Sequence, residues 1–234
     1  MQIILVLVYN KRKMDTKKLF YGLLRKKECL RPTIRGWILI LFAIILFNTV
    51  LFIRIHPFLA PVKLVNSNIM IVEGWLPNYV LEKVAKDFQS KRYRLIITTG
   101  GSITPGSKVL HTFATDAAAK LIRLGVSSEV VVAVSAPDVS RDRTYSSALS
   151  VWDWLKNTHL EIKAVNLYSV GAHGRRSWML YKMAFPSKVK VGIVSVPNNS
   201  YDPLHWWESS NGVKAIIEEF VTYLYARLLF HPKN

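Results

Sequence analysis

One histidine and two arginines lie together where a strand is predicted to run into a helix. The stretch is YSVGAHGRRSWMLY, residues 168–181, and it contains His173, Arg175 and Arg176. A helix N-terminus attracts anions and disfavours basic side chains, and no Asp or Glu occurs between residues 162 and 201. A bound phosphate or carboxylate would remove this conflict, because guanidinium groups bind both in bidentate fashion. We therefore expect an anion site in which His173 could also transfer a proton, unless these side chains simply pack in the loop or point to solvent.

Further candidate groups follow the ends of other predicted strands. Gly100 and Gly101 would let backbone N–H groups approach a ligand closely, although Gly-Gly is also a common turn. Arg143 and Thr144 begin a predicted helix, and capping explains the threonine but not the arginine. Glu73 follows the first predicted strand and is a candidate for acid–base chemistry.

Several well-known chemistries have no motif in this sequence. There is no HExxH motif and no cysteine cluster for zinc, no GxSxG of a serine hydrolase, and no phosphate-binding P-loop. A GxGxxG dinucleotide fingerprint is also missing. The sequence therefore predicts neither a metal site nor a particular cofactor.

The charge and one apolar run predict a membrane anchor. The formal net charge is +17, and residues 1–54 contribute 11 Lys/Arg against 2 Asp/Glu. Residues 36–53 form 18 positions without a charge, close to the length that crosses a hydrocarbon core of roughly 30 Å. The basic residues before this run predict a single-pass inner-membrane protein with a cytoplasmic N-terminus and a periplasmic C-terminal domain. The alternative, a cleaved signal peptide, fits poorly because tail and run are too long.

The chain is therefore divided into a basic tail (1–35), a transmembrane anchor (36–54), a linker (55–65) and a domain (66–234). Cys29 is the only cysteine and lies in the tail, so the exported domain cannot use disulfides. We do not expect nucleic acid as a partner, because a domain on the periplasmic side of the membrane would not meet it.

Strand-like and helix-like patterns alternate through the domain. Apolar strands alternating with helices indicate a parallel sheet covered on both faces. We predict an α/β fold: a Rossmann-like, doubly wound parallel sheet with helices on both faces, preceded by one transmembrane helix. Ligands of such folds bind outside the carboxyl ends of the strands. The predicted strands are 68–72, 94–99, 129–134, 163–170 and 189–196, and the predicted helices are 78–91, 112–125, 143–157, 175–185 and 211–230.

With these residues identified, the chain resembles the YdcF-like family, which includes the SanA and ElyC envelope proteins. The similarity covers roughly residues 66–230. Ser169, His173 and Arg176 match the family's Ser/Thr-x-x-x-His-x-x-Arg motif in full, and Glu219 fits the Glu of its final helix. Two shorter motifs are also similar: Thr99-Gly100-Gly101 resembles its Ser-Gly-Gly and Thr115-Asp116-Ala117 its Ser/Thr-Glu-Ala.

The chain departs from the family pattern at several places, among them Leu81, where the first helix of the family has an arginine, and Ser146, where an acid is usual. Glu73-Gly74-Trp75 replaces the glycine-rich turn after the first strand, and Arg143 and Ser147 stand where asparagines are usual. The resemblance implies a Rossmann-like domain and a role in maintaining the bacterial envelope, in a divergent branch whose ligand could differ.

The resulting hypothesis is an envelope-biogenesis factor, enzyme or binding protein, acting on an anionic small molecule or a lipid-linked phosphate. Glu73 or Asp116 would orient a sugar, a water molecule or a metal ion. The alternatives are a non-catalytic module that recruits partners and an S-adenosylmethionine-binding protein that uses Glu73 for the ribose. The candidate catalytic residues are His173 and Glu73, and the candidate ligand-binding residues are Gly100, Gly101, Asp116, Arg143, Thr144, Ser169 and Arg176.

Overall fold

The computed structural model describes residues 32–90, 93–104, 111–158 and 161–232. The chain forms two compact units, Met1–Thr49 and Val50–Asn234. The predicted basic tail falls largely outside the described residues. The candidate site lies in the second unit.

The apolar run forms one long helix, α1 (Ile34–Leu59, 26 residues), whose most apolar window is not buried in the protein. At 1.5 Å per residue the helix is about 39 Å long, which is enough to cross a membrane. The predicted linker differs from the structure, because α1 continues to Leu59, which is fully buried. The two prolines suggested a linker, but Pro57 lies in the last turns of α1, and the Pro61 carbonyl accepts a hydrogen bond from the backbone of Ser195.

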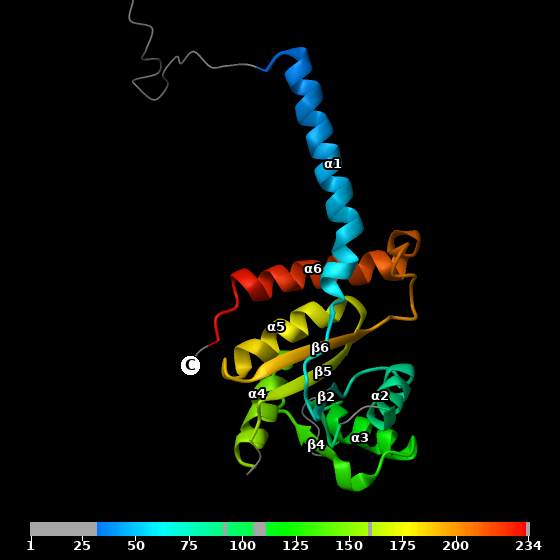
Figure 1. The fold of residues 1–234 in the computed structure, drawn as a ribbon, viewed down its shortest axis with the longest axis vertical. Helices are drawn as coiled ribbons and strands as arrows, with labels where there is room; N and C mark the ends of the chain where they lie inside the picture. The colour runs from blue at the N-terminus through cyan, green and yellow to red at the C-terminus, as the bar shows by residue number, and fades with distance from the viewer. Residues whose placement is uncertain (1–31, 91–92, 105–110, 159–160, 233–234) are drawn as a thin grey trace, which may run out of the picture. The chain divides into compact units, whose positions relative to one another are not determined.

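Six strands form one sheet in the order β1-β6-β5-β2-β3-β4 (Figure 1). The five long strands pair in parallel, and only the two-residue β1 pairs antiparallel, with β6. This confirms the predicted α/β fold and adds an antiparallel edge strand that the sequence did not suggest. The strands are β1 (Val62–Lys63), β2 (Ile69–Glu73), β3 (Leu95–Gly100), β4 (Val131–Ser135), β5 (Ala164–Val170) and β6 (Lys190–Val196).

Helices cover both faces of the sheet (Figure 1). The core on one face joins the sheet to α2 and α3, and the core on the other joins it to α4 and α5. A last helix, α6, contacts α5 and the short helix η2. The helices are α2 (Asn78–Ser90), α3 (Phe113–Arg123), α4 (Arg143–Lys156), α5 (Gly174–Ala184) and α6 (Ser210–Leu228), with short 3₁₀ helices η1 (Ser128–Val130), η2 (Gly171–His173) and η3 (Trp206–Glu208).

The connections leave β2 and β5 in opposite directions. The chain after β2 leads through α2 to β3, whereas the chain after β5 leads through α5 to β6, on the other side of the sheet. Such a reversal opens a crevice at the carboxyl ends of the two central strands. Because alternate residues of a strand face opposite ways, Glu73 at the end of β2 points to the same face as Ile69 and Ile71, the face covered by α4 and α5.

Candidate functional site

A cavity of about 1050 Å³ lies at the carboxyl edge of the sheet. It is bounded by the ends of β2 and β3, the segment between β4 and α4, the start of α5, and α6. The structure therefore brings most of the candidate residues of the sequence together. Those that line the cavity are Glu73, Gly100, Gly101, Arg143, Thr144, His173 and Arg176.

The floor beside the cavity is a row of four polar side chains on neighbouring strands. Strand register pairs Thr99 with Glu73 and Ser169 with Ser195, and Ser169 Oγ donates a hydrogen bond to Glu73 Oε2 at 2.5 Å. All four side chains are buried. Among the described residues, the hydroxyls of Thr99 and Ser195 have no hydrogen-bond partner. In β2, β3, β5 and β6, the last side chain on this face of the sheet is therefore polar, whereas the preceding ones are apolar.

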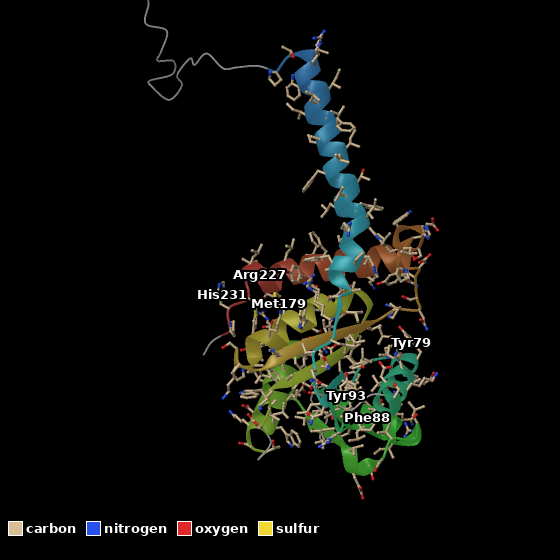
Figure 2. All side chains as sticks on the ribbon, in the orientation of Figure 1. Tyr79, Phe88, Tyr93, Met179, Arg227 and His231 are labelled. Carbon is tan, nitrogen blue, oxygen red and sulfur yellow. The ribbon has the colours of Figure 1, made fainter. Side chains whose placement is uncertain are left out.

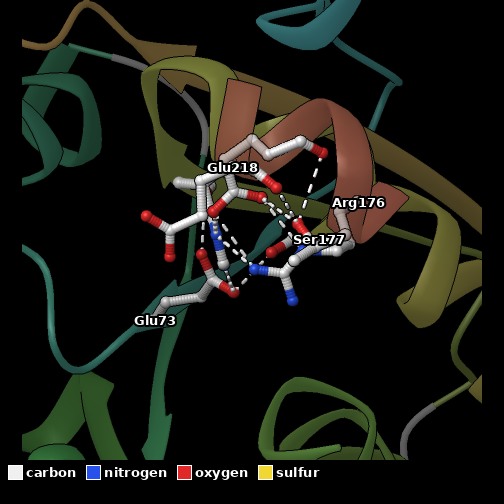
Figure 3. Close-up of polar contacts among 8 residues, drawn as sticks. Glu73, Arg176, Ser177 and Glu218 are labelled. Atoms are coloured by element: carbon white, nitrogen blue, oxygen red, sulfur yellow. Dashed lines mark hydrogen bonds and ion pairs between the residues drawn. The ribbon is translucent and has the colours of Figure 1, made fainter. Parts of the chain in front are cut away.

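Glu73 is the central acid of this row. Its carboxylate accepts hydrogen bonds from Ser169 and from Ser177 on α5, the latter at 2.7 Å, and lies 3.6 Å from His173 Nε2 (Figure 3). Burial alone would raise the pKa of Glu73. The nearby charge of His173 and the hydrogen bonds from Ser169 and Ser177 outweigh burial and hold the pKa of Glu73 below its ordinary value. Glu73 is therefore a buried carboxylate anion.

Glu219 of α6 joins His173 and Arg176 at the start of α5. Its Oε1 lies 2.7 Å from His173 Nδ1 and 3.1 Å from Arg176 Nη2, and its Oε2 accepts from Arg176 Nε at 3.0 Å. Burial opposes ionisation, but the bonds and charges of His173 and Arg176 lower the pKa of Glu219 to about 2. The guanidinium therefore binds a carboxylate of the protein itself through two nitrogens.

His173 is a cation held between two carboxylates. Burial lowers its pKa, but the charge of Glu73 and the bond to Glu219 reverse this and raise the pKa to about 9. Because an ionised carboxylate can only accept, Nδ1 carries a proton and donates it to Glu219. Arg176 Nη2 lies 3.0 Å from the same Nδ1. These two nitrogens are both donors, and both donate to Glu219 Oε1. Trp75 packs edge-on against the imidazole, with ring centroids 4.8 Å apart.

These contacts correct the premise that the basic residues after β5 lack a partner. The acid comes from Glu219, beyond the acid-free interval of the sequence. Arg175 points elsewhere: its Nε donates to the Phe58 carbonyl at 2.7 Å, and its guanidinium lies 4.1 Å from the centre of the Phe58 ring. Arg176 is thus part of a charge-balanced cluster of Glu73, His173, Arg176 and Glu219, called here the charge cluster.

The start of α4 presents a different kind of positive charge to the cavity. Its N-cap residue, Asp142, adopts a left-handed conformation (φ 54°) and its side chain does not cap the helix. Arg143 at the first helical position is exposed, and among the described residues it makes no ion pair. Thr144 and Gly101 lie on the same cavity. Free N–H groups, a guanidinium and a glycine turn favour an anion here, and the carboxylates of Asp138 and Asp142 line the same cavity beside them.

Two candidate residues do not line the cavity. Asp116 lies on α3 and forms an ion pair with Lys120 at 2.8 Å. Ser169 is fully buried and acts on Glu73. Sequence reasoning missed Ser177 as part of the site, and it reached Thr99 and Glu219 only through the family resemblance. The polar residue near the end of each apolar strand was the available signal for Thr99.

Gly74 fixes the close approach of β2 to the start of α3. A Cβ at this position would lie 2.3 Å from the Phe113 carbonyl oxygen, which is backbone and cannot move aside freely. We expect Gly74→Ala to lower the free energy of unfolding by about 1–3 kcal/mol, the usual effect of overpacking. Thermal unfolding of the full chain in detergent measures this. Gly101→Ala is the control, since its Cβ would meet nothing nearer than 3.4 Å, and equal losses in both variants would contradict the packing argument.

Among the described residues, no group of three or more His, Cys, Asp or Glu side chains is arranged to hold a metal ion. Comparison of the chain with protein-family models, with curated proteins and with solved structures finds no match.

Proposed function

We propose that this protein is a membrane-anchored factor of the bacterial envelope that binds a phosphate-bearing ligand in the cavity at the sheet edge. The observation that carries the proposal is the uncapped start of α4, with exposed Arg143, on the same cavity as the Gly100–Gly101 turn. The phosphate would be bound by the Arg143 guanidinium and by backbone N–H groups of the first turn of α4. Polyprenyl phosphates and nucleotide-like molecules share this chemistry.

Within the charge cluster, His173 would donate to this ligand, and the other members would hold its ring in place. With a pKa of about 9, His173 is protonated at neutral pH, so it suits donation of a proton to a phosphate oxygen rather than abstraction of one. Its Nε2 faces Glu73 Oε1 at 3.6 Å, which is an ion-pair distance but too long for a hydrogen bond, and no other described residue accepts from it. Arg176 would position His173 through Glu219, because its guanidinium is already bound to that carboxylate.

The anchor and the family resemblance support the envelope assignment. α1 is long and apolar enough to cross a membrane, and the Lys/Arg residues before it favour a cytoplasmic N-terminus with the α/β domain on the periplasmic side of the inner membrane. Ser169, His173, Arg176 and Glu219 carry the YdcF-like resemblance, and all four lie in or beside the charge cluster.

A thermal-shift screen of the full chain in detergent tests the proposal. The panel holds inorganic phosphate, pyrophosphate, nucleotides, short polyprenyl phosphates and S-adenosylmethionine. A ligand at about 100 times its Kd stabilises the folded state by about 2.7 kcal/mol. We expect a phosphate compound to raise the melting temperature of the wild type and of Arg141→Ala, and to have little effect on Arg143→Ala. Arg141 is the matched control, because it is an exposed arginine two residues away that does not line the cavity.

Two outcomes would overturn the proposal. No shift with any anion would favour the module that recruits partners. A shift with S-adenosylmethionine alone, unchanged in Arg143→Ala, would favour the methyl-donor reading. That reading needs an acid free to bind ribose hydroxyls, whereas Glu73 already accepts from Ser169 and Ser177.

A further inference from the structure

The outer face of α6 is apolar where a surface helix is normally polar. The side chains at its centre are Ile217, Val221, Leu224 and Leu228, which are 55%, 57%, 37% and 65% exposed. Their spacing of four, three and four residues places them in one line along the helix. We call these four residues the α6 stripe. The opposite face of α6 contains buried Ile216 and Ala226 together with Glu219 of the charge cluster.

Further exposed apolar side chains lie just before and just after the α6 stripe in the sequence. Leu204 and Trp207, just before α6, are 76% and 40% exposed, and Leu229 follows the stripe at 70%. Exposed apolar patches of this extent mark contact surfaces on soluble domains. Exposing such a stripe to water is unfavourable, so we expect an apolar partner or environment to cover it.

The end of α1 indicates what covers the α6 stripe. Phe52 belongs to the apolar run of α1, and its ring lies 4.8 Å from the ring of Trp206 and 4.9 Å from that of Trp207. Further along α1, the ring of Phe58 lies 5.3 Å from that of Tyr223 in the middle of α6. Phe52 and Phe58 are six residues apart, which is about 9 Å along the axis of α1. Thus α6 and η3 contact the last turns of α1, where the apolar run ends. Figures 1 and 2 show the end of α1 crossing α6.

The polar groups around the α6 stripe suit the boundary of a bilayer. Lys214 and Arg227 are exposed on α6 on either side of the stripe, exposed Glu218 lies on the Lys214 side, and Arg54 is exposed just beyond the apolar run of α1. Tryptophan and tyrosine rings favour the same boundary, and η3 and α6 supply several. An apolar stripe flanked by basic residues is typical of a helix that lies in the plane of the membrane surface.

We propose that α6 lies in the interface of the same bilayer that α1 crosses, with the α6 stripe inserted among the lipid head groups and upper acyl chains. The inference rests on α1 spanning the membrane and does not depend on the nature of the cavity's ligand. Helices of this kind bury the apolar face about 5–10 Å into the boundary region. The opposite face of α6 forms part of the cavity wall through Glu219, Thr222 and Tyr225.

Fluorescence quenching of the full chain in lipid nanodiscs tests this proposal. Cys29, the only cysteine, is replaced by serine, and one environment-sensitive label is placed by Val221→Cys, Leu228→Cys or Lys86→Cys. Lys86 is exposed on α2 and serves as the control, and Ile45→Cys inside the apolar run is the reference for a spanning residue. Quenchers are attached to the upper acyl chains of the lipids in one set and dissolved in the buffer as iodide in another.

We expect the lipid quenchers to remove most of the fluorescence at positions 221 and 228 and little at 86, with iodide giving the reverse order. Equal quenching by lipid at 221, 228 and 86 would overturn the proposal. So would a label at 45 that the lipid does not quench, because α1 would then not span. Rapid disulfide crosslinking through unlabelled Val221→Cys would also overturn it, by identifying a second copy of the chain as the cover.

Discussion

Replacing Glu219 with glutamine is expected to lower the free energy of unfolding by about 3 kcal/mol, the lower end of the usual loss when one partner of a buried ion pair is removed. Glu219 is the only carboxylate that contacts both His173 and Arg176 among the described residues. Without its charge, two largely buried cations would lie 3.0 Å apart with no anion between them. Deprotonation of His173 would relieve part of the repulsion, so the pKa of His173 should fall below 9 at the same time.

Glu218→Gln is the matched control for this prediction. Glu218 is the neighbouring residue on α6, and it is exposed. Its replacement should change stability by no more than about 0.5 kcal/mol, as is usual for surface positions. Denaturant unfolding of the full chain in detergent gives both values. Similar losses in the two variants would show that α6, and not the charge cluster, is the sensitive element.

The stability of the wild type should decrease between pH 6.5 and 9. The pKa of His173 is about 9 in the folded protein, above its ordinary value of 6.5, so the folded state holds this proton more tightly. The stabilisation is complete below pH 6.5 and is lost as the pH rises through 9. At 1.36 kcal/mol per pH unit, the loss is about 3 kcal/mol. The lowered pKa of Glu219 describes the same contact from the acid side, where stability is lost as the pH falls from 4.5 towards 2.

A comparison with His173→Gln isolates this effect from other titrating groups. The difference in unfolding free energy between wild type and variant should narrow by about 3 kcal/mol between pH 6 and pH 9.5. NMR of ¹³C-labelled histidine rings then gives the pKa directly, since the variant identifies the signal of residue 173. A constant difference across this range, or a measured pKa near 6.5, would contradict the cluster as described.

Most of the fold could be predicted from the sequence, because in a doubly wound sheet the apolar residues of each strand and helix follow the spacing that burial requires. The predicted strand 163–170 is β5 (Ala164–Val170), and the predicted helix 143–157 is α4 (Arg143–Lys156). The sequence predicted a linker over 55–65 from its two prolines, whereas residues 55–59 continue α1. Whether Leu59 is exposed or buried depends on its contacts with η3 and α6, more than a hundred residues away.

The location of the candidate site was predictable from the sequence, but the ion-pair partners of its charged residues were not. The rule that ligand groups follow strand ends located Glu73, Gly100 and His173 on one cavity. The partner of Arg176 was not predictable from local charge, because Glu219 reaches it from a helix 43 residues away. Asp116 was placed by motif similarity alone, and in the structure it is half-buried on α3 and pairs with Lys120 four residues later.

The central claim is that a phosphate-bearing ligand binds at the start of α4, beside the protonated His173. The most direct test is the ring signal of His173 in the ¹³C-labelled full chain, followed while a short polyprenyl phosphate is added to nanodiscs. The account predicts a saturable shift of this signal in the wild type and in Arg141→Ala, little shift in Arg143→Ala, and no shift of His205, which does not line the cavity. A His173 signal that does not respond, or that responds equally in Arg143→Ala, would contradict it.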